Sequence, residues 1–238
     1  MSTGNVTVVT GAAGALGSAL TRHLAKSGHR VVALDRKEME GPLRVLEKEL
    51  ASSVLSLVTD VALESDWNAT LAHAAAKFSA PTGAVLTAGG WSGGSPIHAS
   101  QGDAVWDSML QSNLETVYRG LRALLPGMVA QGRGSIVVIG ARGAVRPEAS
   151  AGAAAYAASK AAVVSLAQTV AEEVRTSGVR VNAVLPSIID TPGNRAGMPD
   201  ADPSKWVSTE SLAGVIAFLL SDLARDISGA LLPVYGQS

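Results

Sequence analysis

The stretch Asn5-Val6-Thr7-Val8-Val9-Thr10-Gly11-Ala12-Ala13-Gly14-Ala15-Leu16-Gly17 joins a short apolar run to a glycine-rich turn. The run over 5–10 is rich in valine, which is typical of a buried strand in a parallel sheet. Apolar residues at helical spacing follow over 15–27. A strand, a glycine turn and a helix in this order predict a pyrophosphate site at the N-terminus of the helix.

Each glycine of this turn has its own expected role. Gly11 permits a tight turn, Gly14 lets the backbone approach a ligand, and Gly17 lets the helix pack against the strand. We include Leu16, in the first turn of the helix, among the cofactor contacts. An ordinary glycine-rich turn between a strand and a helix is the alternative, since such a motif alone is weak evidence.

A second strand-like run, 29–34, ends at Asp35, about 20 residues beyond the glycine turn. A carboxylate there would accept hydrogen bonds from the adenosine 2′-hydroxyl and repel a 2′-phosphate. Asp35 therefore favours NAD(H) over NADP(H), although the adjacent Arg36 leaves NADP(H) possible. The alternative for Asp35 is a turn residue that ends a strand.

Tyr156 and Lys160 are four residues apart, so they share one face of a helix. An ammonium nearby would favour the phenolate and lower the pKa of the tyrosine. Such a tyrosine can pass a proton to an oxygen or nitrogen that receives electrons. A chance pairing is the alternative, but the surrounding alanines leave room for a cofactor and favour a catalytic pair.

Strands and helices alternate along the chain, which predicts a parallel sheet covered on both faces. We expect a single α/β domain over 1–238 with a doubly wound, mostly parallel, seven-stranded sheet of the Rossmann type. The expected strands lie near 5–10, 30–34, 54–58, 83–88, 134–140, 179–184 and 230–235, and the expected helices near 15–27, 41–51, 64–78, 102–131, 154–176 and 209–222.

Over nearly its whole length the chain resembles the short-chain dehydrogenase/reductase family. The residues that carry this resemblance are Gly11, Gly14, Gly17, Asp35, Asp60, Val61, Ala88, Gly89, Asn113, Tyr156, Lys160, Asn182 and the run 186–191.

The resemblance implies a role for several of these positions. It places Asp60 and Val61 at the adenine, and Ala88 and Gly89 beside the ribose. Pro186, Ile189 and Thr191 would belong to the loop that holds the nicotinamide, and Asn113 would support a water chain to Lys160 as part of the catalytic set.

The most consequential departure from the family pattern is Ala141. It stands after the fifth expected strand, where the family's catalytic serine normally binds the substrate carbonyl. Ser150 and Ser159 are close in sequence, but neither is expected at the matching strand end. The lost hydroxyl argues against ordinary ketone or alcohol chemistry.

Within the family, the chain is similar to the dihydropteridine reductases, which also lack the serine. The similar stretches are 14–18, 88–94, 140–142, 190–195 and 198–206. This similarity implies NADH-dependent reduction of a flat quinonoid dihydropterin, with Trp91 and Ala141 at the substrate. Trp91 could stack on such a ring, or it could be a loop aromatic that covers the core.

Composition excludes several classes of function. A net charge of −1 without a basic stripe gives nucleic-acid binding no electrostatic support. The absence of cysteine excludes disulfides and thiolate catalysis, and the four histidines lack metal-ligand spacing, so no metal is expected. We see neither a signal peptide nor a membrane-spanning run and expect a cytoplasmic protein.

The long Pro/Gly/Asp-rich stretch 190–206 is expected to close over a small-molecule substrate as a lid. Its alternative is a surface excursion without a role. By analogy with the family, the apolar surplus on 114–125 and 161–174 suggests a homodimer or homotetramer.

Three hypotheses remain open at this stage. The first is an NADH-dependent reductase of a flat heterocycle, and the second is a carbonyl reductase or alcohol dehydrogenase that tolerates Ala141. The third is a non-catalytic dinucleotide-binding sensor, against which the intact Tyr156/Lys160 pair argues.

Overall fold

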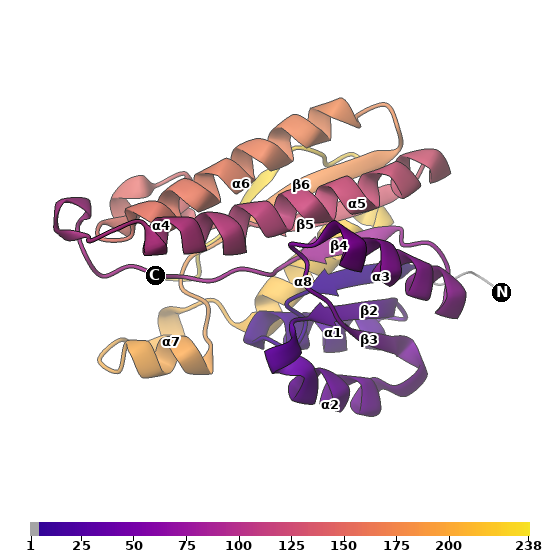
Figure 1. Ribbon diagram of the computed structural model, residues 1–238, viewed down its shortest axis with the longest axis horizontal. Helices are drawn as coiled ribbons and strands as arrows, with labels where there is room; N and C mark the ends of the chain where they lie inside the picture. The colour runs from indigo at the N-terminus through magenta and orange to yellow at the C-terminus, as the bar shows by residue number, and fades with distance from the viewer. Residues whose placement is uncertain (1–4) are drawn as a thin grey trace.

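Seven parallel strands form the centre of the computed structural model, which describes residues 5–238 (Figure 1). They are β1 (Val6–Thr10), β2 (Arg30–Asp35), β3 (Val54–Val58), β4 (Gly83–Leu86), β5 (Gly134–Ile139), β6 (Val179–Pro186) and β7 (Leu231–Val234). Their order across the sheet is β3-β2-β1-β4-β5-β6-β7, and each neighbouring pair is parallel. The predicted fold class is confirmed.

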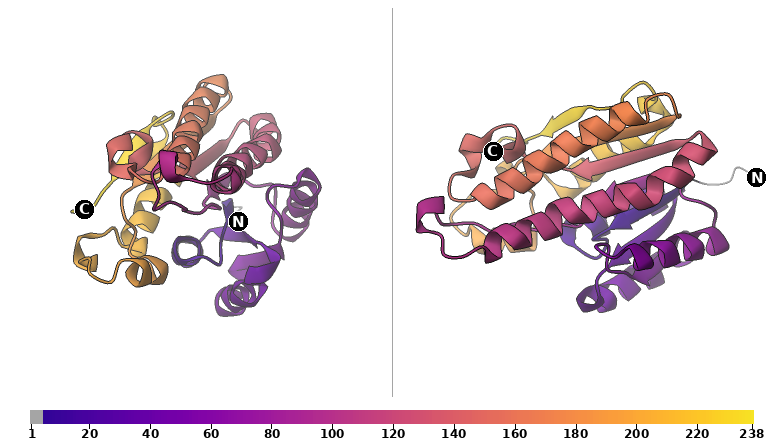
Figure 2. Two further views of the ribbon diagram at one scale, coloured as in Figure 1. Left: turned by 60° about the vertical axis from the view of Figure 1, so that its left-hand side comes forward. Right: turned by 45° about the horizontal axis from the view of Figure 1, so that its top comes forward.

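Helices cover both faces of this sheet, as the alternation predicted (Figures 1 and 2). One face carries α3 (Glu64–Lys77), α5 (Thr116–Gln131) and α6 (Ala154–Glu173), and the other carries α1 (Ala15–Lys26), α2 (Glu40–Leu50) and α8 (Thr209–Leu220). Because both faces are covered, all residues of β1 and β5 are buried. Alternate residues enter opposite layers: Val8 packs with the α5 side, and Val9 packs with the α1 side.

The predicted helix over 102–131 is interrupted. It consists of α4 (Ala104–Met109), a π-helical segment (Leu110–Glu115) and α5. A π segment adds a residue to one turn, often beside a functional site. Here it contains Asn113, whose side chain is fully buried.

The chain builds the sheet outward in one direction from β1 to β3 and in the other direction from β4 to β7. The strand order therefore reverses between the neighbours β1 and β4. Ligands of such sheets bind beyond the carboxyl ends of the strands at this point. The segment after β6, which holds α7 (Pro192–Gly197), extends beyond the layers at the same end (Figure 1). Among residues 5–238, no helix is long and apolar enough to cross a membrane.

Candidate active site

The glycine turn forms a tight cradle before α1. Gly11 has a positive φ of 61°, and Gly14 N–H donates to its carbonyl at 3.1 Å. A Cβ on Gly17 would lie 2.0 Å from the Gly11 oxygen, so this glycine packs on the turn itself. Gly17 therefore lets the start of α1 pack closely on the turn that directly follows β1.

The N-terminus of α1 is suited to an anion. The helix starts after Gly14, and no side chain caps it. The backbone N–H groups of its first turn, including that of Leu16, are therefore available to a ligand, and the helix dipole favours negative charge there. These features fit the pyrophosphate of a dinucleotide.

Asp35 connects the end of β2 to the glycine turn. Its carboxylate accepts hydrogen bonds from the backbone N–H groups of Ala13 and Arg36, both at 2.9 Å. Four lone-pair sites on a carboxylate leave room for ribose hydroxyls as well. The Arg36 side chain is exposed and lies 3.6 Å from the Glu38 carboxylate.

The other expected adenine and ribose contacts lie at the ends of β3 and β4. Asp60 is exposed and accepts a hydrogen bond from Ala62 N–H at 3.0 Å, whereas Val61 is buried. Ala88 N–H donates to the Thr10 hydroxyl at 3.0 Å. A Cβ on Gly11 would lie 3.2 Å from Ala88 N, so the loops after β1 and β4 are in contact.

Asn113, Lys160 and Gly89 meet in one place. A Cβ on Gly89 would lie 2.5 Å from Asn113 Oδ1 and 3.5 Å from Lys160 Nζ. Asn113 Oδ1 accepts from Gly90 N–H at 2.9 Å, and its Nδ2 donates to Ser159 Oγ at 3.0 Å. The structure thus brings together three predicted residues from segments that are up to 71 positions apart in the sequence.

Sequence reasoning missed the contribution of Ser159. Its hydroxyl is fully buried, accepts from Asn113 and donates to the Tyr156 carbonyl at 2.8 Å. Its place directly before Lys160 was the available signal. Ser159 is therefore engaged within α6 and the π segment, away from the end of β5, as expected.

Burial changes both titratable groups of the candidate pair. It raises the pKa of Tyr156 to about 12 and lowers the pKa of Lys160 to about 8. The expected lowering of the tyrosine pKa is therefore wrong for the protein alone, because loss of hydration dominates. Lys160 Nζ donates to the carbonyl of Ile139, the last residue of β5, at 2.9 Å.

Trp91 lies on a loop that is fastened at both ends. Gly90 is held by Asn113, and the Gly152 carbonyl accepts hydrogen bonds from the next loop residues, Gly94 at 2.8 Å and Ser95 at 3.1 Å. The Trp91 side chain is 64% exposed, which contradicts the alternative that it covers the core. The loop packs just before α6, the helix of Tyr156.

The loop after β6 contains the remaining expected cofactor contacts. Pro186 ends the strand, and Ile189 forms an isolated parallel bridge with Val207. Thr191 accepts a hydrogen bond from Asn194 N–H at 3.1 Å and so caps α7. The hydroxyl proton of Thr191 stays available to a ligand.

Ala141 is the first residue after Gly140 at the end of β5. It is 5% exposed and has extended backbone angles. Its carbonyl accepts from Ala144 N–H at 3.0 Å, which closes a single helical turn. No hydroxyl is present at this position of the chain.

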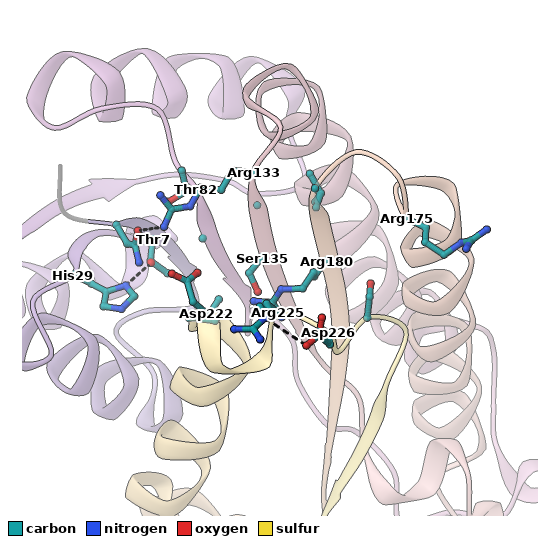
Figure 3. Close-up of a pocket in the computed structure, with 17 residues that line it drawn as sticks. Thr7, His29, Thr82, Arg133, Ser135, Arg175, Arg180, Asp222, Arg225 and Asp226 are labelled. Carbon is teal, nitrogen blue, oxygen red and sulfur yellow. Dashed lines mark hydrogen bonds and ion pairs between the residues drawn. The ribbon is translucent and has the colours of Figure 1, made fainter. Parts of the chain in front are cut away.

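A cavity of about 440 Å³ lies at the opposite, amino edge of the sheet (Figure 3). Several of its polar side chains are engaged within the protein. Arg180 donates to the carbonyls of Leu219, Ser221 and Ile227, and the Thr7 hydroxyl is 2.9 Å from His29 Nδ1. The expected site residues all lie at the other edge of the sheet.

The comparisons with known proteins agree with this geometry. The family model described as short chain dehydrogenase matches residues 5–201. The chain is 34% identical to 2-(R)-hydroxypropyl-CoM dehydrogenase of Xanthobacter autotrophicus, with 97% of each chain covered. It is 35% identical to cis-4-hydroxycyclohexanecarboxylate dehydrogenase of Sinomonas cyclohexanicum, over 97% of this chain and 95% of the relative.

A solved structure shows the same fold with a cofactor. The 3-ketoacyl-(acyl-carrier-protein) reductase of Brucella melitensis, complexed with NADH, matches with a TM-score of 0.86 and 28% identity over 98% of this chain and 97% of that one. These relatives are dehydrogenases and reductases, and they give no support to the narrower similarity to dihydropteridine reductase. The chain belongs to the short-chain dehydrogenase/reductase family and is an NAD(P)-dependent oxidoreductase.

Proposed function

We propose that the protein interconverts a carbonyl compound and its secondary alcohol, with Tyr156 as the proton-transferring group. The observation that carries this proposal is the meeting of Lys160, Asn113 and Gly89 at the carboxyl edge of the sheet. The glycine cradle before α1 opens at the same edge. A dinucleotide bound across the switch point would therefore reach the Tyr156 helix.

A nicotinamide cofactor, held by the glycine turn and Asp35, would supply the hydride chemistry at this edge. Tyr156 gives a proton to the substrate oxygen in reduction and removes it in oxidation. Lys160 has three N–H donors, of which one is used by Ile139, so others are available to a ribose hydroxyl. With a pKa near 8, its amine carries the positive charge that a phenolate needs at neutral pH.

The side chain of Asn113 connects the loop after β4 to helix α6. Through Gly90 it fixes the segment that leads to Trp91, and through Ser159 it is connected to the Tyr156 backbone. We assign Asn113 the role of linking Lys160 to solvent through water, as its position beside that ammonium suggests.

We propose NAD(H) as the preferred cofactor. Asp35 is anchored by two backbone N–H groups at the point where the adenosine ribose would lie, and its charge disfavours a 2′-phosphate. Asp35→Ala should raise the KM for NADH and lower the KM for NADPH. Equal KM values for the two cofactors in the unmodified protein would contradict the preference.

The carbonyl assignment is tested by turnover with a panel of cyclic ketones, β-ketoacyl esters and polyol-derived ketoses. The names of relatives support this panel, since they include cyclohexanol dehydrogenase, galactitol 2-dehydrogenase and 3-oxoacyl-[acyl-carrier-protein] reductase. Ala141→Ser should raise ketone turnover by restoring a donor at the end of β5. The carbonyl assignment would be contradicted if neither the unmodified enzyme nor Ala141→Ser consumed NADH with any ketone of the panel.

A second candidate substrate is a flat heterocycle such as a quinonoid dihydropterin. Two observations favour it: Ala141 offers no hydroxyl for a carbonyl, and the exposed Trp91 ring could stack on a planar ligand. NADH oxidation with quinonoid dihydropterin, compared with the ketone panel, decides between the two. The non-catalytic sensor has no comparable support, because the relatives are named enzymes.

We propose that 190–206 closes over the substrate. Its ends are joined by the Ile189–Val207 bridge, and a two-point ion pair between Asp190 and Arg195 stiffens its start. Protection of this segment from proteolysis by NADH plus product would support closure. Cleavage at an unchanged rate would contradict it.

We also propose a homodimer or homotetramer formed through α5 and α6, which run side by side (Figure 2). Tyr118 and Val129 leave 45% and 40% of their surfaces exposed on α5. Light scattering after gel filtration gives the mass directly. A monomer at micromolar concentration would exclude this assembly.

A further inference from the structure

Ala141 leaves the end of β5 without a hydrogen-bond donor for a substrate oxygen. The residue starts the single turn 141–144, which lies directly beyond the strand. Reduction of a carbonyl builds negative charge on its oxygen, and a fixed donor at that point lowers the barrier. Under the proposed carbonyl chemistry, another group must supply the donor.

Ser150 packs on this same turn, although it is nine residues further along the chain. A Cβ built on Gly143 would lie only 2.0 Å from Ser150 Oγ and 3.2 Å from Ser150 Cβ. The Ser150 hydroxyl therefore occupies the space that a side chain at Gly143 would fill. Gly143 is two residues from Ala141, so the hydroxyl is placed beside the turn that lacks one.

The position of Ser150 is fixed from its other side. Its carbonyl accepts a hydrogen bond from Ala153 N–H at 2.9 Å, and α6 begins at the next residue. Between Ser150 and α6, the carbonyl of Gly152 accepts hydrogen bonds from the loop that carries Trp91. Ser150 thus lies between the Ala141 turn and the start of the Tyr156 helix, two residues before the glycine that bonds to the Trp91 loop.

From this placement we infer that Ser150 Oγ donates the hydrogen bond to the substrate oxygen that Ala141 cannot donate. The inference rests on the proposed carbonyl function. It adds a catalytic residue from later in the connection between β5 and α6, which sequence alignment to the end of β5 does not reveal. A serine hydroxyl has one donor and two acceptor sites, so it can also bind the product alcohol.

The test compares Ser150→Ala, Ser150→Cys and the double variant Ala141→Ser/Ser150→Ala with the unmodified enzyme on the best ketone of the panel. We expect Ser150→Ala to lower kcat/KM on the order of 100- to 1,000-fold, the usual effect of removing one donor to a developing oxyanion. Ser150→Cys keeps the volume with a weaker donor and should lie between the two. The double variant should regain most of the lost activity.

Ser52→Ala is the matched control, since Ser52 is exposed in the turn between α2 and β3. It should leave kcat/KM unchanged, as should NADH binding in all variants. A Ser150→Ala enzyme within twofold of the unmodified one would overturn the inference, and so would a loss that the double variant does not recover. Turnover by the unmodified enzyme tests the proposed function separately, so the two failures are distinguishable.

Discussion

At the amino edge of the sheet the polar groups bond to one another, whereas at the carboxyl edge they keep bonding capacity for a ligand. Arg180, which lines the cavity of Figure 3, donates to three backbone carbonyls in and after the end of α8, those of Leu219, Ser221 and Ile227. By contrast, α1 starts without a side-chain cap, and Lys160 uses one of its three donors. Of the two polar edges, the one with an uncapped helix N-terminus and a buried ammonium is the better candidate for function.

Substitution of Tyr156 is the strongest test of the functional role that we assign to the carboxyl edge. Tyr156→Phe should reduce kcat by about 100- to 10,000-fold, because it removes the proton donor and leaves the ring in place. Steady-state NADH oxidation measures the loss, and fluorescence titration should show unchanged NADH binding. Tyr118→Phe, on the exposed side of α5, is the control and should retain full activity.

Gly17→Ala should destabilise the protein by about 3 kcal/mol, since its methyl group would meet the Gly11 backbone oxygen at 2.0 Å. Backbone on both sides prevents easy relief. Gly14→Ala meets the same oxygen at 3.3 Å and should cost only about 1 kcal/mol. Urea unfolding compares them, and equal losses would show that Gly17 is not the tighter position.

At the amino edge, Arg180→Met should lower the free energy of unfolding by about 2 to 3 kcal/mol, because backbone carbonyls near α8 lose their donors. The kcat of the folded fraction should not change. Arg175→Met is the control at the same cavity; its exposed pair with Glu172 is worth less than about 1 kcal/mol. A fall in kcat for Arg180→Met but not for Arg175→Met would instead show that the amino edge of the sheet contributes to catalysis.

The smallest effect is a pH dependence caused by Lys160. Below pH 8 its amine is protonated in both folded and unfolded chains, so the cost of burial is fully present. From about pH 8 to its ordinary pKa of 10.5, only the unfolded chain keeps the proton, so stability rises with pH. Tyr156, with a raised pKa, opposes this only above pH 10.

We expect this gain to reach about 2 kcal/mol between about pH 7.5 and 9.5. Urea unfolding at the two pH values measures it. In Lys160→Met the gain should disappear, since no proton is released there. An identical pH slope in both proteins would show that Lys160 is not the source.

The fold was predictable from sequence because its signals are local. Short apolar runs such as 5–10 become buried parallel strands, and the glycine turn sits between a strand and a helix as expected. The confirmed elements extend to all seven strands. The helix over 102–131 was predicted without its π segment, which no periodicity in that stretch indicated.

The candidate site was predictable only in its list of residues. Family resemblance named Asn113 and Lys160, but their proximity to Gly89 depends on how distant segments pack. The direction of the Tyr156 pKa shift failed for the same reason, since burial depends on the folded surroundings. The position of Ser150 beside Gly143 likewise depends on how the connection between β5 and α6 folds.

The parallel bridge between Ile189 and Val207 has a consequence for how this enzyme could be remodelled. The bridge holds the two ends of the loop 190–206 next to each other, so the residues between them form a segment with fixed endpoints. A loop of different length and sequence could replace this segment between the same two ends without moving the sheet or Tyr156. Substrate preference would then become exchangeable independently of the proton-transfer machinery.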